Sequence, residues 1–542
     1  MPSAASPAST RRRFLALGGL LAARGAGDPP AAAAEARAEP ASRPTLRWAA
    51  RVSADMPPPD AATHLLSRVA WGATPADKER VAALGMSAWI EEQLDVVRID
   101  ASGVEGPLTA GIPELSLELA KLELLNQRTY RVTDALNAAT LYRQVYSPRR
   151  LYEAMVDFWS DHFSINQYME GATWHKLIDD RDVIRPHALG RFEDLLTASA
   201  RSVAMLIYLN NELNRKGQLN ENYAREIMEL HTLGVAEEGE PYTEIDVVEV
   251  ARCFTGWAWA NRNGDPQYGN YRFYPDRHDP GVKLVLGDVI PAGGGEMDGR
   301  AVIHMLCRHP ATARFLATKL VRRFVCDDPM AQVPQLVAKV AQAYLGSDGD
   351  IATTLRTLLN SPEFADAFGN YGGRLYRPME LAVRMMRAVG VPQALFVPAL
   401  GDAKQTFHAW YTNLVGWDGF LNHMGQVPFA WLTPDGYPDR KEDWTASVVM
   451  LYRWNLGLAM AEGRLVPGFR PRLNRPSDLA TAPEIVDHWV QRLLGRAMLE
   501  ADRDTLLAWF TDSGKLNLTQ AVAQREDGLI ALILDSPYFQ WR

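Results

Sequence analysis

The first residues that could do chemistry stand in the segment Gly217 to Gly234, GQLNENYAREIMELHTLG. Glu226 and Glu229 are two carboxylates three positions apart, and Arg225 precedes them. On a helix this spacing puts both carboxylates on one face, where they can transfer protons or hold a divalent metal ion. The same residues also fit a solvated helix face on which Arg225 pairs with Glu229 at i, i+4 and no reaction occurs.

Further polar and aromatic residues in other segments could complete such a site. In helical bundles, carboxylates and imidazoles from separate helices form acid–base or metal sites. The candidate catalytic residues are Glu226, Glu229, His162 and Arg225. The candidate substrate-binding residues are Asn220, Asn222, His278, Asp279 and Trp159. The candidate ligands for a divalent metal, whose presence the sequence leaves open, are Asp161 and His231.

Several of these candidates also have a structural interpretation. His162 and His231 each fit a satisfied position in a core, and His278-Asp279-Pro280 fits an Asx-type turn. Glu226 and His231 are about 140° apart on a helical wheel, so they cannot easily bind the same ion. No histidine stands three residues after Glu226, which argues against a di-iron bundle of the usual kind.

Several other chemistries are disfavoured by the sequence. It contains no G-x-S-x-G elbow, no P-loop, no G-x-G-x-x-G before a helix and no H-E-x-x-H motif. The formal net charge of -8 argues against a nucleic-acid partner, which would need a basic face. The chain contains 15 Trp, and these rings fit either ordinary cores or sugar-binding surfaces.

The elements that must position these residues are predicted to be helices almost throughout, from His64 onward. Apolar residues recur with a period of 3.6, and segments such as Thr243–Trp259 follow it. Pro75 marks one helix start and Gly85 its stop, while Gly234 ends a helix that Asn220 or Asn222 would cap. The prediction is a mainly α, multi-helix globular array with a small β-hairpin or extended excursion near residues 270–290. Ser361-Pro362 and Ser536-Pro537 each predict a cap and a first helical position.

The N-terminal residues read as an export signal followed by a linker. Thr10 to Leu17, TRRRFLAL, resembles a twin-arginine signal, so residues 1–35 are predicted to be a signal peptide. Its apolar run is too short for a permanent membrane anchor, and no other window reaches the length of a membrane span. Residues 36–60 are predicted to be a disordered Ala/Pro-rich linker, residues 61–465 a helical core domain, and residues 466–542 a C-terminal helical segment packed on it. We therefore expect a periplasmic or secreted protein exported by the twin-arginine route.

Cysteine use is compatible with that compartment. The chain has three cysteines, Cys253, Cys307 and Cys326, so one disulfide is allowed and one thiol would remain. No C-x-x-C or C-x-x-C-H motif is present, which excludes a zinc ribbon and a c-type haem attachment site.

Longer segments resemble one bacterial family. In chain order, which is also the family's order, they are HLLSRVAWGATPAD, MVDFWSDHFSIN, YLNNELNRKGQLNENYAREIMELHTLGV, YTEIDVVEVARCFTGWAW, HPATARFLATKLVRRFV and MGQVPFAWLTPDGYP. From about residue 60 to the C-terminus, the chain resembles the family catalogued as domain of unknown function 1800. The resemblance implies an exported, mostly α-helical protein, often encoded beside an exported sulfatase- or phosphatase-like partner.

The chain departs from the family's pattern in two places. The family's Phe-Trp-His-Asn-His-Phe segment reads Phe158-Trp159-Ser160-Asp161-His162-Phe163 here, which weakens any model that needs both histidines. The late segment reads WLTPDGYP where a Pro-Asn-x-x-Gly-Trp pattern is usual.

Two functions follow from these observations. The first is a hydrolase or lyase-like enzyme with a carboxylate and histidine site, with or without a divalent metal, acting on an envelope or extracellular polymer. The second is a non-catalytic envelope scaffold or maturation partner of a co-exported enzyme, in which the same polar residues lock helices together. Convergence of Glu226, His162 and His278 at an open cleft would favour the enzyme, and a sealed, internally paired network would favour the scaffold.

Overall fold

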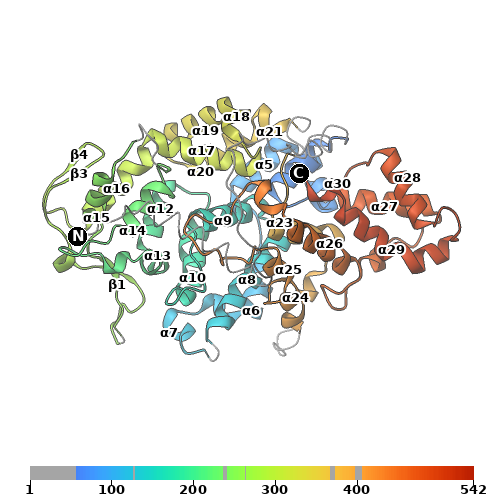
Figure 1. Ribbon diagram of the computed structural model, residues 1–542, viewed down its shortest axis with the longest axis horizontal. Helices are drawn as coiled ribbons and strands as arrows, with labels where there is room; N and C mark the ends of the chain where they lie inside the picture. The colour runs from blue at the N-terminus through green and yellow to red at the C-terminus, as the bar shows by residue number, and fades with distance from the viewer. Residues whose placement is uncertain (1–56, 126–127, 236–240, 263, 367–372, 397–405) are drawn as a thin grey trace, which may run out of the picture. The chain divides into compact units, whose positions relative to one another are not determined.

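The computed structural model describes residues 57–125, 128–235, 241–262, 264–366, 373–396 and 406–542. The described residues belong to one compact unit. The described part is mainly α-helical, as predicted, and Figure 1 shows the helices in chain order. The predicted signal peptide and all but the last four residues of the predicted linker lie outside the described residues.

The helices of the N-terminal half include α8 and α9, which contact each other (Figure 1). Their bounds are α3 (Ala61–Val69), α4 (Pro75–Leu84), α5 (Met86–Leu94), α6 (Ser102–Gly111), α7 (Leu119–Leu122), α8 (Arg128–Tyr146), α9 (Arg150–His162), α10 (Thr173–Asp179), α11 (Arg185–His187), α12 (Phe192–Arg201), α13 (Val203–Tyr208), α14 (Asn222–Glu229) and α15 (Glu244–Cys253).

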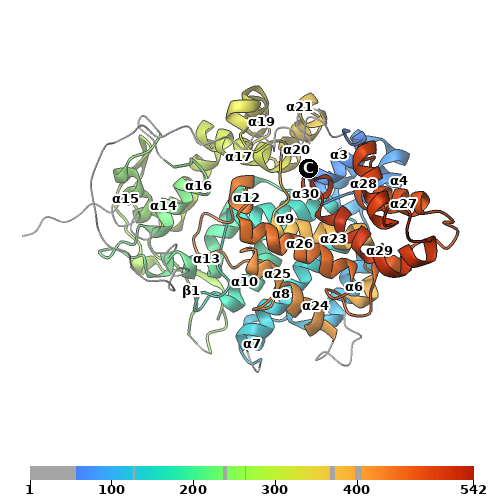
Figure 2. The same cartoon turned by 45° about the vertical axis from the view of Figure 1, so that its right-hand side comes forward.

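The helices of the C-terminal half form two groups that are visible in Figure 2: α17, α19 and α20 pack together, and α26, α27, α28 and α29 pack together. Their bounds are α16 (Glu296–Arg308), α17 (Pro310–Phe324), α18 (Pro329–Gln332), α19 (Pro334–Gly346), α20 (Ile351–Leu359), α21 (Pro362–Ala365), α23 (Pro378–Val389), α24 (Thr406–Leu414), α25 (Phe420–His423), α26 (Ser447–Ala461), α27 (Ala482–Leu494), α28 (Glu500–Phe510), α29 (Leu518–Asp535) and α30 (Pro537–Gln540).

Local sequence accounts for several helix ends. Thr74 caps α4 by accepting a hydrogen bond from the Asp77 amide, and Pro75 takes the first position. Gly85, with φ of 81°, separates α4 from α5 as predicted. Ser361 and Ser536 each precede a helix that begins with proline, which confirms both predicted starts, although only the Ser361 side chain makes the capping hydrogen bond.

Two apolar clusters form the core. The first takes residues from α3, α5, α9, α12, α14, α16, α17 and α20, and includes Trp159, Phe163 and Phe324. The second takes residues from α8, α23, α26, α27 and α29, and includes Trp489 and Leu456. Helix α9 supplies the first cluster with most of its apolar residues and the second with Ala154, so it contributes to both.

The β structure that the model describes consists of two small antiparallel pairs. Strand β1 (Trp257–Trp259) pairs with β2 (Tyr271–Phe273), and β3 (Lys283–Val285) pairs with β4 (Asp288–Ile290). The β3–β4 hairpin confirms the strand prediction near residues 270–290. The predicted helix through Trp259 is wrong, because α15 ends at Cys253 and Trp257–Trp259 is a strand. Gly256 allows this change: its φ is 80°, and an added Cβ would lie 2.6 Å from the Tyr274 carbonyl oxygen.

Helix α14 is shorter than the sequence predicts. It runs from Asn222 to Glu229 rather than to about Leu233, and neither predicted cap forms, because the capping position is Glu221. After Glu229 the amides of His231 and Leu233 bond to carbonyls five residues back, which widens the turn and ends the α-helical pattern.

All three cysteines, Cys253, Cys307 and Cys326, are free and buried, so the allowed disulfide does not form. Among the described residues, no helix has the length and apolar character needed to cross a membrane.

Candidate functional site

Helix α9 brings one polar face to two neighbouring hollows. Leu151, Met155 and Trp159 are buried in the first apolar cluster. Asp157 and Asp161, four residues apart, lie together on another face, as the helical period requires. Both aspartates line a hollow, and the larger of the two hollows also includes His162, the last residue of the helix.

The large hollow has a volume of about 970 Å³ including its open mouth, and residues of α9, α17 and the loop 431–443 line it. Its rim residues Asp435, Arg440 and Asp443 are exposed, so it opens to solvent. The small hollow, of about 550 Å³ including the open solvent at its mouth, is lined by residues of α8, α9, α23 and the loop 426–437. Asp161, Trp431 and Tyr437 line both hollows, so the two are neighbours.

A glycine turn fixes the loop against Asp161. The Tyr437 amide donates a 2.6 Å hydrogen bond to Asp161 Oδ1. Gly436 has φ of 76°, and an added Cβ would lie 2.2 Å from the Asp161 carbonyl oxygen. Because no other residue type can approach the helix end this closely in that conformation, Gly436 is needed where it stands.

Asp161 and Asp439 meet at one guanidinium group. Nη1 of Arg377 lies 3.0 Å from Asp161 Oδ2 and 3.5 Å from Asp439 Oδ1. Burial raises the pKa of the Asp161 carboxyl to about 6 against the opposing effect of Arg377, and Asp439 and Asp157 add to the rise. Burial also acts to raise the pKa of Asp439, but Arg377 and other arginines outweigh it and hold that pKa below its usual value. The site therefore holds one readily protonated carboxyl beside one firmly ionised carboxylate.

Lys319 and His162 form a second polar pair in the large hollow. Lys319 Nζ lies 3.0 Å from His162 Nδ1, and His162 Nε2 lies 3.1 Å from the His231 carbonyl oxygen. Burial lowers the pKa of His162 well below its usual value, and nearby Lys319 lowers it further, so the ring is neutral. A neutral ring accepts a hydrogen bond from Lys319 at Nδ1 and donates one from Nε2 to the His231 carbonyl oxygen. Burial also lowers the pKa of Lys319, although the negative charges of Asp161 and Asp439 act to raise it.

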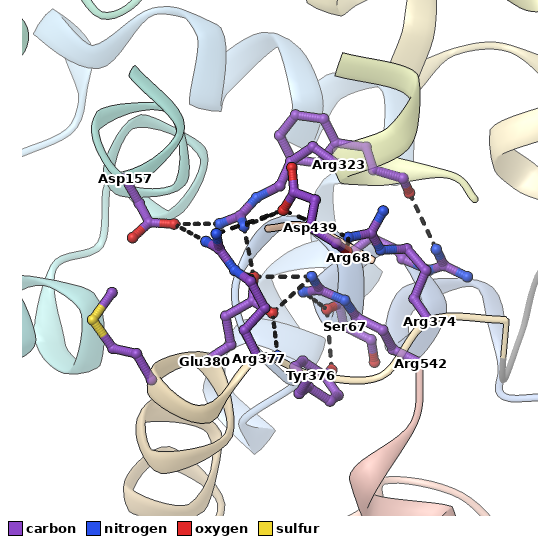
Figure 3. A network of polar contacts seen from close by, with 12 residues as sticks. Ser67, Arg68, Asp157, Arg323, Arg374, Tyr376, Arg377, Glu380, Asp439 and Arg542 are labelled. Carbon is purple, nitrogen blue, oxygen red and sulfur yellow. Dashed lines mark hydrogen bonds and ion pairs between the residues drawn. The ribbon is translucent and has the colours of Figure 1, made fainter. Parts of the chain in front are cut away.

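A buried network of arginines and carboxylates adjoins the hollows, and Figure 3 shows it: Asp157 and Arg377 line the small hollow and Asp439 the large one. Glu380 on α23 lies 2.9 Å from Arg542 Nη2 and 2.9 Å from Arg323 Nη1, and it is fully buried. Burial acts to raise the pKa of Glu380, but Arg542, Arg323 and Arg377 hold it well below its usual value. Asp157 binds both Arg323 and Arg377. The network thus ties α9, α17 and α23 to Arg542.

Glu226 and Glu229, the carboxylate pair that the sequence singled out, are buried, and neither lines either hollow. Glu226 is 4% and Glu229 8% exposed on α14. Arg225 lies 3.6 Å from Glu229 and makes shorter contacts, of 2.8 and 2.6 Å, with Glu244. The helix end does reach the large hollow, because Leu230 lines it.

The two metal candidates have different surroundings. His231 is fully buried, its ring centroid lies 4.9 Å from that of Phe163, and neither ring nitrogen has a hydrogen-bond partner among the described residues. Burial lowers the pKa of His231 to about 3. Asp161 is held instead by Arg377 and the Tyr437 amide. Within the described ranges, no three His, Cys, Asp or Glu side chains are arranged so that they could hold a metal ion.

The five substrate-binding candidates do not meet at one place. His278 Nε2 lies 3.1 Å from Asp298, which also pairs with Lys283. Asp279 pairs with Arg252 and accepts a hydrogen bond from the Gly281 amide, which confirms the Asx-type turn. The buried Trp159 donates to the Ala188 carbonyl.

Asn220 and Asn222 serve local backbone geometry instead. The Asn220 side chain accepts from the Asn222 amide, and the Asn222 side chain donates to the Leu209 carbonyl. None of the five substrate-binding candidates lines either hollow.

The sequence interpretation missed Lys319, Arg377, Glu380 and Asp439. A usable signal was present, because Lys319 and Arg323 stand four apart within the apolar repeat of α17. Arg377 and Glu380 likewise flank the start of α23, in which every residue is buried. A charged residue on the buried face of a helix needs a buried partner of opposite charge, because an unpaired buried charge is costly.

Comparison with known proteins gives one match. A family model described as a protein of unknown function, DUF1800, matches residues 64–541. Searches of curated proteins and of solved structures gave no match.

Proposed function

Because the chain belongs to the DUF1800 family, whose description names no activity, we propose a function from the geometry of the large hollow: an acid–base hydrolase or lyase. Asp161 is the general acid and Asp439 the general base. The observation that carries this proposal is the contrast between their two environments. One carboxyl has a pKa raised to about 6 and its neighbour has a lowered pKa, at the same arginine and in the same open hollow.

This contrast supplies both halves of a proton-transfer reaction. Near neutral pH a fraction of Asp161 is protonated and can donate to a leaving group. Asp439, held ionised, can accept a proton from water in hydrolysis or from carbon in elimination. Environments that push two pKa values apart are the usual sign of such an assignment of roles.

Lys319 and the neutral His162 complete the site. Lys319 lies between carboxylates and an imidazole, and it can bind a developing negative charge on the substrate. His162 fixes the lysine through Nδ1 while its own Nε2 is held by the His231 carbonyl. In this proposal His162, a catalytic candidate in the sequence, positions Lys319, whereas Asp161 and Asp439 take the acid–base roles assigned there to Glu226 and Glu229.

The test is a substrate screen with two active-site variants and one control. Wild type, Asp161→Asn, Asp439→Asn and Asp288→Asn are incubated with fluorogenic esters, phosphoesters, amides and glycosides and with uronate-containing polymers. Asp288 is exposed on β4, outside both hollows. We expect turnover by wild type and Asp288→Asn, with a pH–rate limb near 6, and a loss of at least about a hundredfold in the other two. Full rates in Asp161→Asn and Asp439→Asn, or no turnover of any class by wild type, would contradict the proposal.

A second candidate function is the envelope scaffold or maturation partner. The observation that favours it is the buried network around Glu380, whose charges are paired internally. Its partner in this proposal is a co-exported sulfatase- or phosphatase-like protein. Co-purification of such a protein with both wild type and Asp161→Asn, in the absence of any turnover, would favour the scaffold.

Export by the twin-arginine route, to the periplasm or the medium, is part of both proposals. It rests on the Thr10–Leu17 segment. We expect an Arg11→Lys/Arg12→Lys variant to stay in the cytoplasmic fraction, while wild type moves to the exported fraction. Equal export of the two would contradict the assignment.

A further inference from the structure

Two cations that line the large hollow have no carboxylate partner. Lys319 and Arg322 stand three positions apart on α17, so they share one face of the helix, and both line the hollow. Among the described residues neither makes an ion pair: Lys319 Nζ contacts the neutral His162 ring, and Arg322 Nε donates to the Asp327 carbonyl oxygen. Both residues are partly exposed, so a ligand in the hollow can reach their charged ends.

The four carboxylates of the same lining are held by other groups or stand at the rim. Asp161 and Asp439 share Arg377. The Asp435 carboxylate accepts hydrogen bonds from two side chains of its own loop, and Asp443 is exposed at the rim. The two cations of α17 are therefore available to an anionic group of a ligand.

These cations lie beside the acid–base pair. Burial lowers the pKa of Lys319 most, Asp161 and Asp439 act to raise it, and Arg322 acts to lower it further, an influence that requires short distances. The side chains of Asp161 and Asp439 are 20% and 16% exposed, so both remain in reach of the hollow. An anion bound by the cations thus places the neighbouring atoms of its ligand at the two carboxyl groups.

The large hollow has room and surfaces for a sugar residue. About 330 Å³ of it is open to the centres of water molecules, of which one needs about 10–15 Å³. Its lining also includes the rings of Phe315, Trp431 and Tyr437. Aromatic rings pack against the apolar face of a sugar ring, and cations bind an acidic group at its edge. A sugar that carries a carboxylate therefore fits both parts of the lining.

We propose that Lys319 and Arg322 bind the carboxylate of a uronate residue in an acidic polysaccharide, and that the reaction is a β-elimination at the carbon next to that carboxylate. This names the substrate class and the reaction of the acid–base site and rests on that proposed function. A carboxylate disfavours loss of a proton from the neighbouring carbon unless its charge is neutralised. Two cations neutralise it and stabilise the charge that develops on its oxygens.

The step balances without a further reactant. Asp439 takes the proton from the carbon next to the carboxylate, and the electron pair of that C–H bond forms a carbon–carbon double bond. The bond between the next carbon and the linkage oxygen breaks, and Asp161 gives its proton to that oxygen. The products are one chain with a new hydroxyl group and one with an unsaturated uronate, and water is not consumed.

The test is cleavage of polygalacturonate and polymannuronate, of their methyl esters, which lack the charge, and of dextran sulfate, which lacks the carboxylate. Ultraviolet absorbance follows the double bond conjugated to the carboxylate, and a reducing-end assay follows every cleavage. We expect wild type to cleave at least one uronate polymer with rising absorbance, and to cleave its methyl ester and dextran sulfate at least about tenfold more slowly.

The variants are Arg322→Gln, Arg322→Lys, Lys319→Gln and the control Arg314→Gln. Arg314 is exposed on α17 outside the lining, so the control makes the same change on the same helix. We expect Arg322→Gln to raise KM for the uronate polymer about ten- to a hundredfold, with partial rescue in Arg322→Lys, and Lys319→Gln to lower kcat. Arg314→Gln should match wild type.

A stability measurement separates binding from a structural role. Because Arg322 has no carboxylate partner among the described residues, Arg322→Gln should melt at the wild-type temperature. A lower melting temperature with an unchanged KM would overturn the proposal. Reducing ends without new absorbance, or equal cleavage of the polymer and its methyl ester, would also overturn it.

The two proposals fail in different ways. Hydrolysis of a neutral substrate that depends on Asp161 and Asp439 but not on Arg322 would sink the uronate proposal alone. Calorimetric binding of trigalacturonate that Arg322→Gln weakens, without turnover of any substrate by wild type, would sink the acid–base proposal and the elimination but support the carboxylate site. Neither binding nor cleavage of any uronate would overturn the carboxylate site itself.

Discussion

At the scale of single residues, Asp161 and Asp439 change the stability of the fold with pH in opposite directions. The folded protein raises the pKa of Asp161 to about 6, so this group favours folding when protonated. Between about pH 4 and 6 the unfolded carboxyl is ionised while the folded one holds its proton, so the contribution is lost as pH rises through that window. The lowered pKa of Asp439 has the reverse sign, and its contribution is present at neutral pH and lost on acidification.

Asp161→Asn is therefore expected to be inactive but more stable. At pH 7 the free energy of unfolding should rise by up to about 3 kcal/mol, because the variant carries no buried charge at that position. Asp439→Asn, the matched variant, should lose stability at pH 7. Urea unfolding from pH 4.5 to 7.5 measures both, and the wild-type fall in stability between pH 4.5 and 6 should flatten in Asp161→Asn. A destabilised Asp161→Asn at pH 7 would show that the carboxylate is a structural ion-pair partner.

The residues also show how far sequence reasoning could go. The Asx turn at Asp279 follows from local chemistry, and the spacing of Asp157 and Asp161 on α9 already puts both on one helix face. Lys319 and Asp439 are 120 positions apart and meet through the tertiary fold, which no spacing rule encodes. The carboxylates of α14 were conspicuous because they are clustered in sequence, yet they line neither hollow.

At the scale of elements, Glu380 is the anion that holds the first turn of α23 against α17 and Arg542. Glu380→Gln keeps the size of the side chain but removes the carboxylate that pairs with the buried Arg542, and it leaves Arg323 with only Asp157 and Asp439 as counter-charges. We expect a loss of about 3–5 kcal/mol in the free energy of unfolding, measured by urea denaturation. Glu79→Gln on the exposed face of α4 is the control and should change stability by less than about 0.5 kcal/mol. A small effect at Glu380 would mean that water or local rearrangement replaces the lost charge.

Element types were more predictable than element ends. Proline and glycine signals place the start of α4, the break before α5 and the starts of α21 and α30 correctly, since they act on the backbone directly. The end of α15 was missed because Gly256 is required by a contact with Tyr274, which lies in another segment. The same holds for Gly436, because the requirement for glycine there comes from its close contact with the Asp161 carbonyl oxygen on another element.

At the scale of the whole molecule, the three free cysteines are chemical reporters of unfolding. Burial raises the pKa of Cys253 to about 12 and that of Cys326 above its usual value, and burial likewise raises the pKa of Cys307. Because a thiolate is the reactive form, we expect a disulfide reagent to titrate almost no thiol in the native protein and three per chain in denaturant. A native thiol that reacts within minutes would show that its part of the core opens readily.

The contact between Glu380 and Arg542 spans 162 positions, and this separation has a consequence in time. At the usual speed of a ribosome, Arg542 is made roughly 8 to 30 seconds after Glu380. Throughout that interval the nascent chain has Glu380 and the partners of α17 but lacks the cation that completes them, and the bridge between Leu375 and Trp541 is also unmade. The helices that Glu380 joins are thus synthesised before the arginine that completes their ion pair, so this contact between α23 and Arg542 can form only late in the folding of the growing chain.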